Sequence, residues 1–311
     1  MRRGAVMAAI TRPMKGQPFD SDFARYPYLA TPKIDGIRFL MVNDSAVSSS
    51  FKKIRNRFIW NRLSKLLPNG LDGEITVGST FNETSSAVMA YEGKPFFTAW
   101  IFDYVNPERK NILSYAERIE ELRSLELEDL NEHSEKIGGR FKILSSPHLV
   151  SNYEDVEFYR DLYIGKGFEG LILRSPKGTY KMGKATHREN LLLKIKEFVD
   201  EEAVVIGFKE LMRNNNAQEI DKFGNMKRSK KSENLVPGNT LGSLIVKRDG
   251  LTFDVGSGFD DSTRKYIWDN QEEFLGQLCK YKYMKFGVKD APRHPIFQGI
   301  RHPDDMTEEV P

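Results

Sequence analysis

The segment TPKIDGIRFL, residues 31–40, places a lysine two residues before an aspartate and then adds a glycine and an arginine. A lysine attacks well only as the neutral amine, so its pKa must fall from about 10.4. Nearby cations and partial burial both lower a lysine pKa. A polar turn before a strand explains the same residues, with Lys33 and Asp35 solvated and Gly36 permitting the bend. This segment alone leaves both interpretations open, because such short patterns arise by chance.

A second group of cations lies in LLLKIK, residues 191–196. Side chains alternate along a strand, so Lys194 and Lys196 share one face while Leu193 and Ile195 pack on the other. Two lysines that project from an apolar strand suit a phosphate ligand. An amphipathic edge strand with solvated lysines explains this motif equally well when it is taken alone.

Two carboxylates and one aromatic run complete the set of chemically capable residues. Glu74 and Glu169 each stand beside a glycine at the opening of an apolar strand. That setting suits a hard cation such as Mg²⁺, which normally accompanies a triphosphate. Either one alone is also explained as a strand-edge acid in water. Most aromatic residues of WIFDY, residues 100–104, belong in a core, and one of them could stack on a flat base.

Length and composition limit the classes of protein that these residues can belong to. The chain has 311 residues, of which 39% are hydrophobic and 29% charged, enough for one large domain or two of ordinary size. A net charge of +3 permits a polyanionic partner without requiring one. The single Cys279 excludes a disulfide framework or a cysteine zinc site within the chain and fits a reducing cytoplasm.

The N-terminal stretch resembles a truncated signal peptide, but its apolar run is too short and Arg12 interrupts it. We therefore expect an arm or a first strand there. No other stretch approaches the length of a membrane span. In the first 200 residues, strand-like runs alternate with helix-like runs. The predicted strands cover residues 37–42, 71–77, 96–105, 168–174 and 190–199, and the predicted helices cover 114–130 and 155–167.

After residue 200 the pattern changes to short strands with one helix. Strands are predicted over 201–211, 241–259, 281–286 and 294–301, with a hairpin at Asp249-Gly250 and a helix over 261–276. This pattern predicts a small barrel such as an OB-fold. Residues 213–240 are polar, and their composition favours a disordered surface loop. That segment carries the densest basic cluster of the chain: Lys227, Arg228, Lys230 and Lys231.

In order and spacing these motifs resemble those of the covalent nucleotidyltransferases, most closely the small ATP-dependent DNA ligases of bacteriophages and other viruses. The motifs of that family are matched by KIDGIR (33–38), a weak SSSFKK (48–53), LDGE (71–74), WIFDY (100–104), EGLILR (169–174), LLLKIK (191–196) and the C-terminal RHPIFQGIRHPDD (293–305). The resemblance implies an α+β fold. A nucleotidyltransferase domain of two antiparallel sheets with flanking helices would span 1–200, and an OB-fold β-barrel would span 201–311.

The resemblance also implies an activity, the ATP-dependent sealing of nicks in duplex DNA during replication, repair or recombination. Lys33 would attack the α-phosphate of ATP, with Mg²⁺ or Mn²⁺ present, to give lysyl-AMP. AMP would pass to the 5′-phosphate of the nick, and the 3′-hydroxyl would then displace it. The partner would be nicked double-stranded DNA and not a membrane. We expect a monomer in the cytoplasm of a bacterial cell or a phage-infected host.

Individual residues receive roles from the same resemblance. Phe102 would stack on the adenine, Ile172 would cover its other face, and Arg301 would orient the leaving pyrophosphate. The nucleotide would be held by Thr31, Lys33, Arg38, Glu74, Phe102, Ile172, Lys194, Lys196 and Arg301. A divalent metal would be bound by Glu169 and Glu74. DNA contacts would come from Arg38, Lys52, Lys53, Arg55, Lys227, Arg228, Lys230 and Lys231.

One position departs from the family pattern. The second motif usually reads S-R-x-x-K, with an arginine that helps to hold the nick phosphate, whereas this chain has Ser49. Lys52, Lys53 and Arg55 are the candidates to replace that contact.

Four other classes explain part of the pattern. A capping guanylyltransferase shares the lysine and the domain plan, but RHPIFQGIR is typical of ligases. An RNA ligase usually carries a different C-terminal domain. A non-catalytic OB-fold nucleic-acid-binding protein leaves the lysines and carboxylates unexplained as a set. An NAD⁺-dependent ligase needs an additional domain before the lysine and cysteines for its zinc module.

Overall fold

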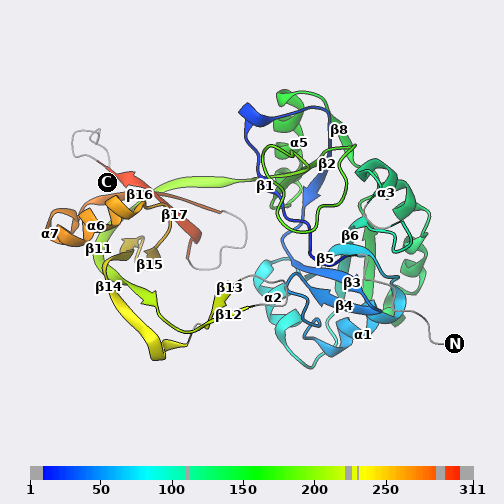
Figure 1. Ribbon diagram of the computed structural model, residues 1–311, viewed down its shortest axis with the longest axis horizontal. Helices are drawn as coiled ribbons and strands as arrows, with labels where there is room; N and C mark the ends of the chain where they lie inside the picture. Colours follow the sequence, from blue (N-terminus) through cyan, green and yellow to red (C-terminus); the bar gives the residue numbers. More distant parts are fainter. Residues whose placement is uncertain (1–9, 110–111, 221–225, 230, 285–290, 302–311) are drawn as a thin grey trace. The chain divides into compact units, whose positions relative to one another are not determined.

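A computed structural model describes residues 10–109, 112–220, 226–229, 231–284 and 291–301 (Figure 1). The chain divides into two compact units, Met1–Lys196 and Glu197–Pro311, and the division falls between strands β10 and β11. Of the predicted N-terminal arm, residues 1–9 lie outside the described part, and Ile10 is already buried in a core. Every helix among the described residues is too short or too polar to span a bilayer.

The first sheet of the first unit has five strands in the order β1-β10-β9-β2-β8. Their bounds are β1 Gln17–Pro18, β10 Leu192–Lys196, β9 Gly170–Arg174, β2 Tyr28–Lys33 and β8 His148–Val150. Helix α5, Tyr153–Gly165, packs on this sheet (Figure 1) and buries Val156 and Tyr163 against Tyr28 and Leu171. The Asn152 side chain caps the helix by accepting from the Asp155 amide at 2.8 Å.

The second sheet has the order β4-β3-β5-β6-β7. Its strands are β4 Ser45–Ser48, β3 Ile37–Val42, β5 Leu71–Val77, β6 Phe97–Tyr104 and β7 Gly139–Ile143. The prediction of two antiparallel sheets is wrong in one respect, because β1 pairs parallel with β10 and β6 pairs parallel with β7. Antiparallel neighbours need only a hairpin, whereas parallel ones need a long crossover. The helical segment between β6 and β7 is such a crossover, and both sheets are therefore mixed.

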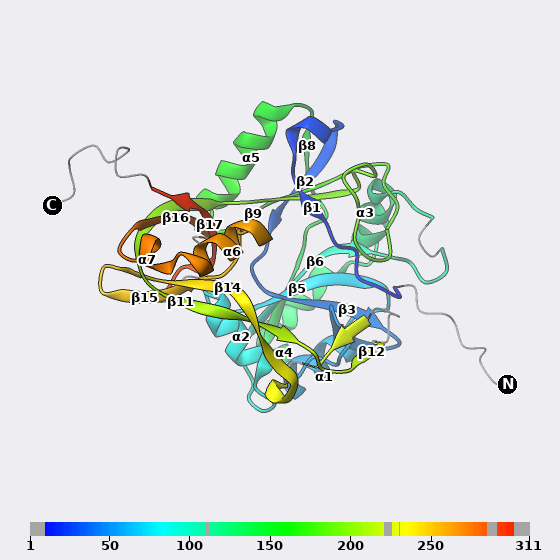
Figure 2. The ribbon, with the colours of Figure 1, turned by 60° about the vertical axis from the view of Figure 1, so that its left-hand side comes forward.

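Helices cover the second sheet (Figure 2): α1 Arg57–Leu66, α2 Phe81–Met89, α3 Tyr115–Arg123 and α4 Ser134–Ile137. Capping boxes at Thr80 and Ser114 begin α2 and α3. The helix predicted over 114–130 instead ends at Arg123 and is followed by a 3-10 helix, η2 Leu127–His133. The Ser124 hydroxyl donates to the Glu121 carbonyl at 2.7 Å, a local bond that competes with helix continuation.

The helices that cover the second sheet place their apolar residues at helical spacing. Tyr115, Ile119 and Leu122 of α3 lie on one face and are buried, as are Ile59 and Leu63 of α1. Full burial of each aliphatic side chain stabilises the unit by ~1.5–3 kcal/mol. This core holds the strands that carry the LDGE and WIFDY motifs.

The second unit contains a five-stranded sheet in the order β15-β14-β11-β16-β17. The bounds are β15 Leu251–Val255, β14 Leu235–Arg248, β11 Phe198–Asn214, β16 Leu278–Met284 and β17 Arg293–Ile300. The predicted hairpin is confirmed, because Asp249 and Gly250 join β14 to β15 with φ values of 48° and 77°. The hydrogen-bonded order is open, and the described ends of the sheet are linked by an isolated bridge between Ser257 and Ile296.

The helix predicted over 261–276 is divided in two. It forms α6, Asp261–Asp269, and α7, Gln271–Phe274. Asn270 between them leaves helical geometry, and its side-chain amide donates to the Tyr266 carbonyl at 2.8 Å. Ile267 of α6 is buried with Leu241, Leu244 and Val255 of the sheet.

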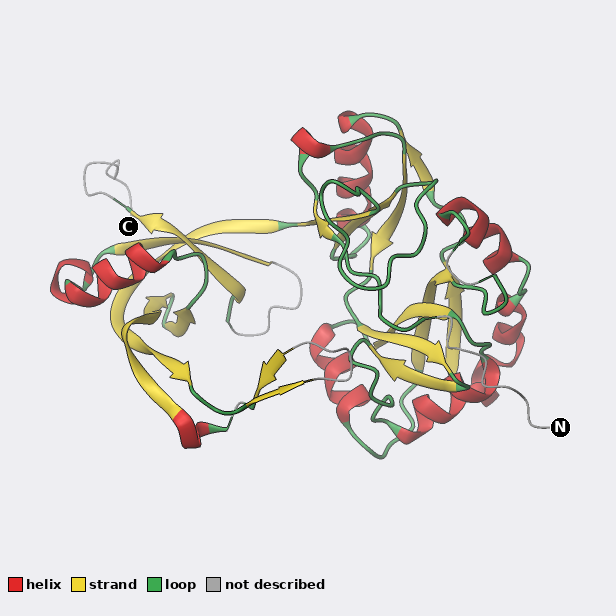
Figure 3. Cartoon of the chain, viewed as in Figure 1, coloured by secondary structure: helices red, strands yellow, loops and turns green. Residues whose placement is uncertain are grey.

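The disordered loop predicted over 213–240 is wrong for the described residues (Figure 3). Strands β12 Gln218–Ile220 and β13 Met226–Arg228 pair there, and a 3-10 helix, η3 Ser232–Asn234, precedes β14. The Asn216 amide donates to the carbonyls of Ser229 at 3.0 Å and Lys231 at 2.8 Å. Buried amide bonds thus order a segment that has few apolar residues. Residues 221–225 and Lys230 lie outside the described part.

Candidate active site

A cavity of about 270 Å³ lies within the first unit, between its two sheets. Strands β2, β9 and β10 supply residues from the first sheet, and β3, β5 and β6 supply residues from the second. Among the residues that line it are many of those selected from the sequence: Thr31, Lys33, Arg38, Glu74, Phe102, Ile172, Lys194 and Lys196.

The register of the first sheet brings the lysines together. Thr31 pairs with Ile172, which pairs with Lys194, so one row of side chains crosses β2, β9 and β10. Directly opposed residues project from the same face of a sheet. The next row runs from Lys33 through Gly170 to Lys196. Motifs that are more than 130 residues apart in the sequence therefore meet on one face.

Glu169 immediately precedes β9, and its side chain lies between the two lysines of the second row. Its carboxylate contacts the Lys33 ammonium and lies 2.7 Å from the Lys196 Nζ, while its amide donates to the Lys33 carbonyl at 3.0 Å. The Glu169 side chain is only 3% exposed. Burial alone would raise its pKa, but Lys33 and Lys196 hold the pKa of Glu169 below its ordinary value. Glu169 is therefore an anion fixed beside the candidate nucleophile.

Two glycines in the motifs are required by close backbone approach. Gly170 has φ +154°, and a Cβ there would lie 2.1 Å from the carbonyl oxygen of Ile195. A Cβ at Gly36 would lie 2.3 Å from the carbonyl oxygen of Ile75 and 2.8 Å from the Cγ of Glu74. Any larger residue would separate these strands. Gly36 thus lets the turn after Lys33 pass directly over the strand that carries Glu74.

Glu74 and Lys194 both feel the enclosed environment of the cavity. Desolvation raises the pKa of Glu74 to about 8, although Lys33 and Arg38 oppose the shift. Desolvation lowers the pKa of Lys194, and the cations of Lys196 and Lys33 lower it further. Each group is thus displaced toward its neutral form, as is common where a protein handles a charged ligand.

Phe102 and Ile172 face the cavity from opposite sheets. The Arg174 guanidinium carbon lies 5.2 Å from the centroid of the Phe102 ring, and that of Arg38 lies 5.7 Å away. Both distances are within the range of cation–π attraction. An aromatic ring opposite an aliphatic side chain is a suitable slot for a flat base.

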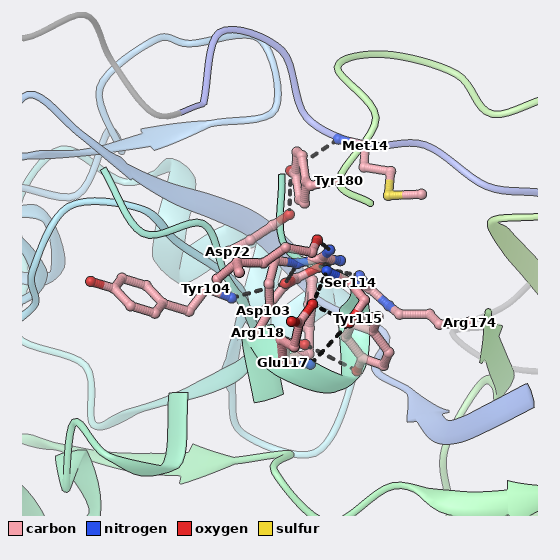
Figure 4. Close-up of polar contacts among 12 residues, drawn as sticks. Met14, Asp72, Asp103, Tyr104, Ser114, Tyr115, Glu117, Arg118, Arg174 and Tyr180 are labelled. Carbon is pink, nitrogen blue, oxygen red and sulfur yellow. Dashed lines mark hydrogen bonds and ion pairs between the residues drawn. The ribbon is translucent and has the colours of Figure 1, made fainter. Parts of the chain in front are cut away.

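Arg38 is held in place by a buried carboxylate. Its Nε and Nη2 donate to the two oxygens of Asp72 at 2.8 and 2.5 Å, and its Nη1 donates to the Met14 carbonyl at 2.6 Å. Tyr180 donates to Asp72 at 2.6 Å and accepts from the Met14 amide at 3.0 Å (Figure 4). Asp72 is fully buried. The bidentate geometry leaves the Arg38 guanidinium little freedom.

Lys15 and Arg174 also line the cavity, although the sequence alone indicated a role for neither. Lys15 comes before the two-residue strand β1 and is placed by backbone bonds of 2.8 Å with Gly183 and Ala185. Nothing in its local sequence indicates that placement. Arg174 does carry a signal, because a lone arginine that ends the apolar run GLILR needs an anionic partner when it is buried.

Three of the predicted DNA-contacting residues of the first unit line a groove separate from the cavity, whereas Arg38 lines the cavity itself. Lys52, Lys53 and Arg55 lie along a groove of about 650 Å³. The Lys53 Nζ stands 4.6 Å from the centroid of the Trp60 ring, and Arg57 also lines this groove. Cations interleaved with aromatic rings are typical of nucleic-acid-binding surfaces.

The remaining predicted residues belong to the second unit. Arg301 donates to Glu202, with 2.8 Å between Nε and Oε1. Lys227 lies 3.9 Å from Glu219 across β12 and β13, and Arg228 donates to the Asn216 carbonyl. Lys231 is exposed, and Lys230 lies outside the described residues.

Several known proteins are similar to this chain. Residues 236–301 match the family model of the DNA ligase OB-like domain. The crystal structure of Chlorella virus DNA ligase-adenylate is 33% identical, with a TM-score of 0.55, and the match covers 94% of this chain and 100% of that one. A second crystal structure of the same ligase-adenylate is 36% identical, covers 94% and 99%, and has a TM-score of 0.53.

The fold extends to more distant structures. The ATP complex of the bacteriophage T7 ATP-dependent DNA ligase is 16% identical over 94% of this chain and 99% of that one, with a TM-score of 0.50. At that identity the likeness concerns the fold alone. No curated protein sequence matches the chain.

Proposed function

Because the chain belongs to the ATP-dependent DNA ligases, we propose that it seals nicks in duplex DNA through a lysyl-AMP intermediate and a 5′-adenylated DNA strand. It has the ligase nucleotidyltransferase fold, with mixed sheets and helices, and an OB-like domain. The single observation that carries the proposal is the Glu169 carboxylate lying between Lys33 and Lys196 at the edge of a cavity that Phe102 also lines.

In the first step the Lys33 amine attacks the α-phosphorus of ATP. A phosphorus–nitrogen bond forms, the bond to the bridging oxygen breaks, and pyrophosphate leaves. Phe102 and Ile172 enclose the adenine, and Lys194 and Lys196 lie against the α-phosphate. The displacement needs positioning and cations around phosphorus more than acid–base groups, and positioned cations are what this cavity offers.

A divalent cation fits the two carboxylates at this site, Glu74 on the cavity wall and Glu169 beside it. The described residues contain no cluster of three or more His, Cys, Asp or Glu side chains that could hold a metal. Mg²⁺ needs fewer, because water and substrate phosphates complete its shell around one or two carboxylates. Glu74 and Glu169 would hold Mg²⁺, or Mn²⁺, and the ion would neutralise phosphate charge.

In the second and third steps AMP passes to the 5′-phosphate of the nick, and the 3′-hydroxyl displaces it. Arg301 serves only the first step, by orienting pyrophosphate. We assign the nucleotidyltransferase chemistry to residues 1–200 and an OB barrel to 201–311, and the bridge between Ser257 and Ile296 supports closure of that barrel. Contacts with the nicked duplex are assigned to Arg38, Lys52, Lys53, Arg55, Lys227, Arg228, Lys230 and Lys231.

The cellular setting belongs to the same proposal. The enzyme acts as a monomer in the cytoplasm of a bacterial cell or phage-infected host, during replication, repair or recombination. Its mildly basic composition, with a net charge of +3, is compatible with a DNA partner.

Incubation with ATP labelled in the α-phosphate, followed by denaturing electrophoresis, tests the first step. The wild-type chain and a Lys177→Ala control, which changes an exposed lysine of the same unit, should both retain label. Lys33→Ala should retain none and should fail to seal a nicked duplex. Normal labelling of Lys33→Ala would exclude lysyl-AMP at this residue, and retention of label from GTP or NAD⁺ instead of ATP would replace the proposed cofactor.

A further inference from the structure

Asp103 is a fully buried carboxylate that two arginines share. Arg118 donates to it twice, from Nε at 2.7 Å and from Nη2 at 3.1 Å, and Arg174 donates to it from Nη1 (Figure 4). The Arg118 and Arg174 side chains are 1% and 5% exposed. Arg118 is further fixed by the carbonyls of Leu113 at 2.9 Å and Gly178 at 3.1 Å. The proposed reaction gives none of the three a direct task.

These residues come from three different elements. Asp103 lies on β6 of the second sheet, Arg174 ends β9 of the first sheet, and Arg118 lies on α3. The Arg174–Asp103 ion pair therefore joins the two sheets that enclose the cavity. Asp103 follows Phe102 directly, and Arg174 lies two residues after Ile172 on the same face of β9. Each member of the ion pair is thus close in sequence to one side of the base slot: Asp103 to Phe102, and Arg174 to Ile172.

Stability alone explains this arrangement poorly. A buried ion pair is often replaceable by apolar residues of similar volume without loss of stability, because the charges lose their hydration. Burial would raise the pKa of Asp103, and the two guanidinium groups hold the pKa below its ordinary value instead. Two rigid, planar guanidinium groups do define distance and angle more narrowly than apolar contacts can. Arg174 also lies 5.2 Å from the centroid of the Phe102 ring, so the same group orients the ring.

We propose that Arg174, held by its ion pair with Asp103, is a positioning residue that fixes the separation of Phe102 and Ile172 and thereby sets the affinity for the adenine base. The inference rests on the proposed function, because it takes the slot between these two side chains as the base site. Arg174 acts on the base through Phe102, whereas Arg118 acts only as an anchor for Asp103.

Two charge-conserving variants separate positioning from stability. Arg174→Lys and Arg118→Lys each lose the planar guanidinium that contacts Asp103, but only Arg174 contacts Phe102. In self-adenylylation at saturating Mg²⁺, Arg174→Lys should raise the KM for ATP about tenfold, equivalent to ~1.4 kcal/mol. Its rate at saturating ATP should stay within about twofold of wild type. Arg118→Lys should lower the Tm about as much as Arg174→Lys does, while its KM for ATP stays within about twofold of wild type.

Equal KM changes in the two variants would show that the cluster only stabilises the fold. A fall in the saturating rate of Arg174→Lys at unchanged KM would place Arg174 at the reacting phosphate, and would also overturn the inference. If Arg174→Lys does not fold, the isosteric Asp103→Asn should give the same rise in KM at an unchanged saturating rate.

A double-mutant comparison tests whether Arg174 acts through the ring. Phe102→Leu and Arg174→Lys should be non-additive, so that the double variant has nearly the KM of Phe102→Leu alone. Full additivity would contradict the inference. Absence of ATP labelling in the wild-type chain would instead refute the proposed function, so the two failures are distinguishable.

Discussion

Replacement of the buried Asp72 by asparagine offers the sharpest test of how the cavity is held together. Asp72 accepts two bonds from Arg38 and one from Tyr180, and none of its surface is exposed. Asparagine keeps the shape but removes the charge and one acceptor. Loss of one partner of a buried ion pair costs ~3–5 kcal/mol. The Arg38 side chain retains 19% exposure, so water can solvate part of its charge. We therefore expect Asp72→Asn to lower the free energy of unfolding by about 3 kcal/mol, the lower end of that range.

Tyr180→Phe serves as the matched comparison, because it keeps the Arg38–Asp72 ion pair and removes only the two bonds of the Tyr180 hydroxyl, one to Asp72 and one from the Met14 amide. A hydrogen bond to a charged group contributes about 1.5–3 kcal/mol, and the ion pair itself remains, so we expect Tyr180→Phe to cost less than Asp72→Asn. For a unit of 196 residues, 1 kcal/mol changes the Tm by ~2–4 °C. Asp72→Asn should therefore lower the Tm of the first unit by about 6–12 °C, with a smaller fall for Tyr180→Phe.

Thermal and urea unfolding followed by circular dichroism measure both effects. The transition of the second unit, which contains neither residue, is the internal reference and should not move. A fall in Tm below about 2 °C for Asp72→Asn would show that Arg38 is held by other contacts. A greater destabilisation by Tyr180→Phe than by Asp72→Asn would show that the ion pair contributes little.

Three further outcomes are expected. Lys33→Arg should be as inactive in AMP labelling as Lys33→Ala, because arginine is not neutral near pH 7; label on Lys33→Arg would contradict an amine nucleophile. The folded-state pKa of Glu74, about 8, lies above its ordinary 4.5, so its contribution to stability is full below pH 4.5 and is lost as pH rises through 8. Glu74→Gln should flatten that part of a Tm–pH profile, and an unchanged slope would argue against the raised pKa. Replacement of the four basic residues Lys227, Arg228, Lys230 and Lys231 by alanine should weaken binding of a nicked duplex and leave ATP labelling unchanged. The dependence of log affinity on log salt concentration should flatten by roughly one unit for each phosphate that is no longer neutralised. Wild-type affinity and salt dependence would place the DNA-binding surface elsewhere.

Much of the cavity was predictable because its residues lie in motifs of the family. For Lys194 and Lys196 the side-chain period of a strand also places both lysines on one face. The same alternation puts Ile172 opposite Glu169, so its place in the cavity followed from the family motif alone. Lys15 was not predictable, since its place depends on backbone bonds with Gly183 and Ala185, which lie far along the chain and in no strand. The contact between Asp103 and Arg174 was not predictable either, because an ion pair between two sheets leaves no pattern in the local sequence.

The predictions of the helix bounds and of the basic segment were wrong for a different physical reason. The apolar spacing of 114–130 is helical, but α3 ends where the Ser124 hydroxyl donates to the Glu121 carbonyl and Glu126 takes a left-handed conformation. In residues 213–240 the composition lacks the apolar side chains that usually order a segment, yet the Asn216 amide satisfies backbone carbonyls directly. Local hydrogen bonds of single polar side chains accompany both departures, and a prediction from the average composition of a segment does not include them.

The charges that line the cavity also constrain its ligand. Cations outnumber carboxylates among the lining residues, with Lys15, Lys33, Arg38, Arg174, Lys194 and Lys196 against Glu74. A polyanion would relieve the repulsion that lowers the pKa of Lys194, but it would make the ionised form of Glu74 less favourable still. A divalent cation has the opposite effect on each group. A triphosphate bound together with its metal satisfies both, which is why we favour a metal–nucleotide complex over either component alone.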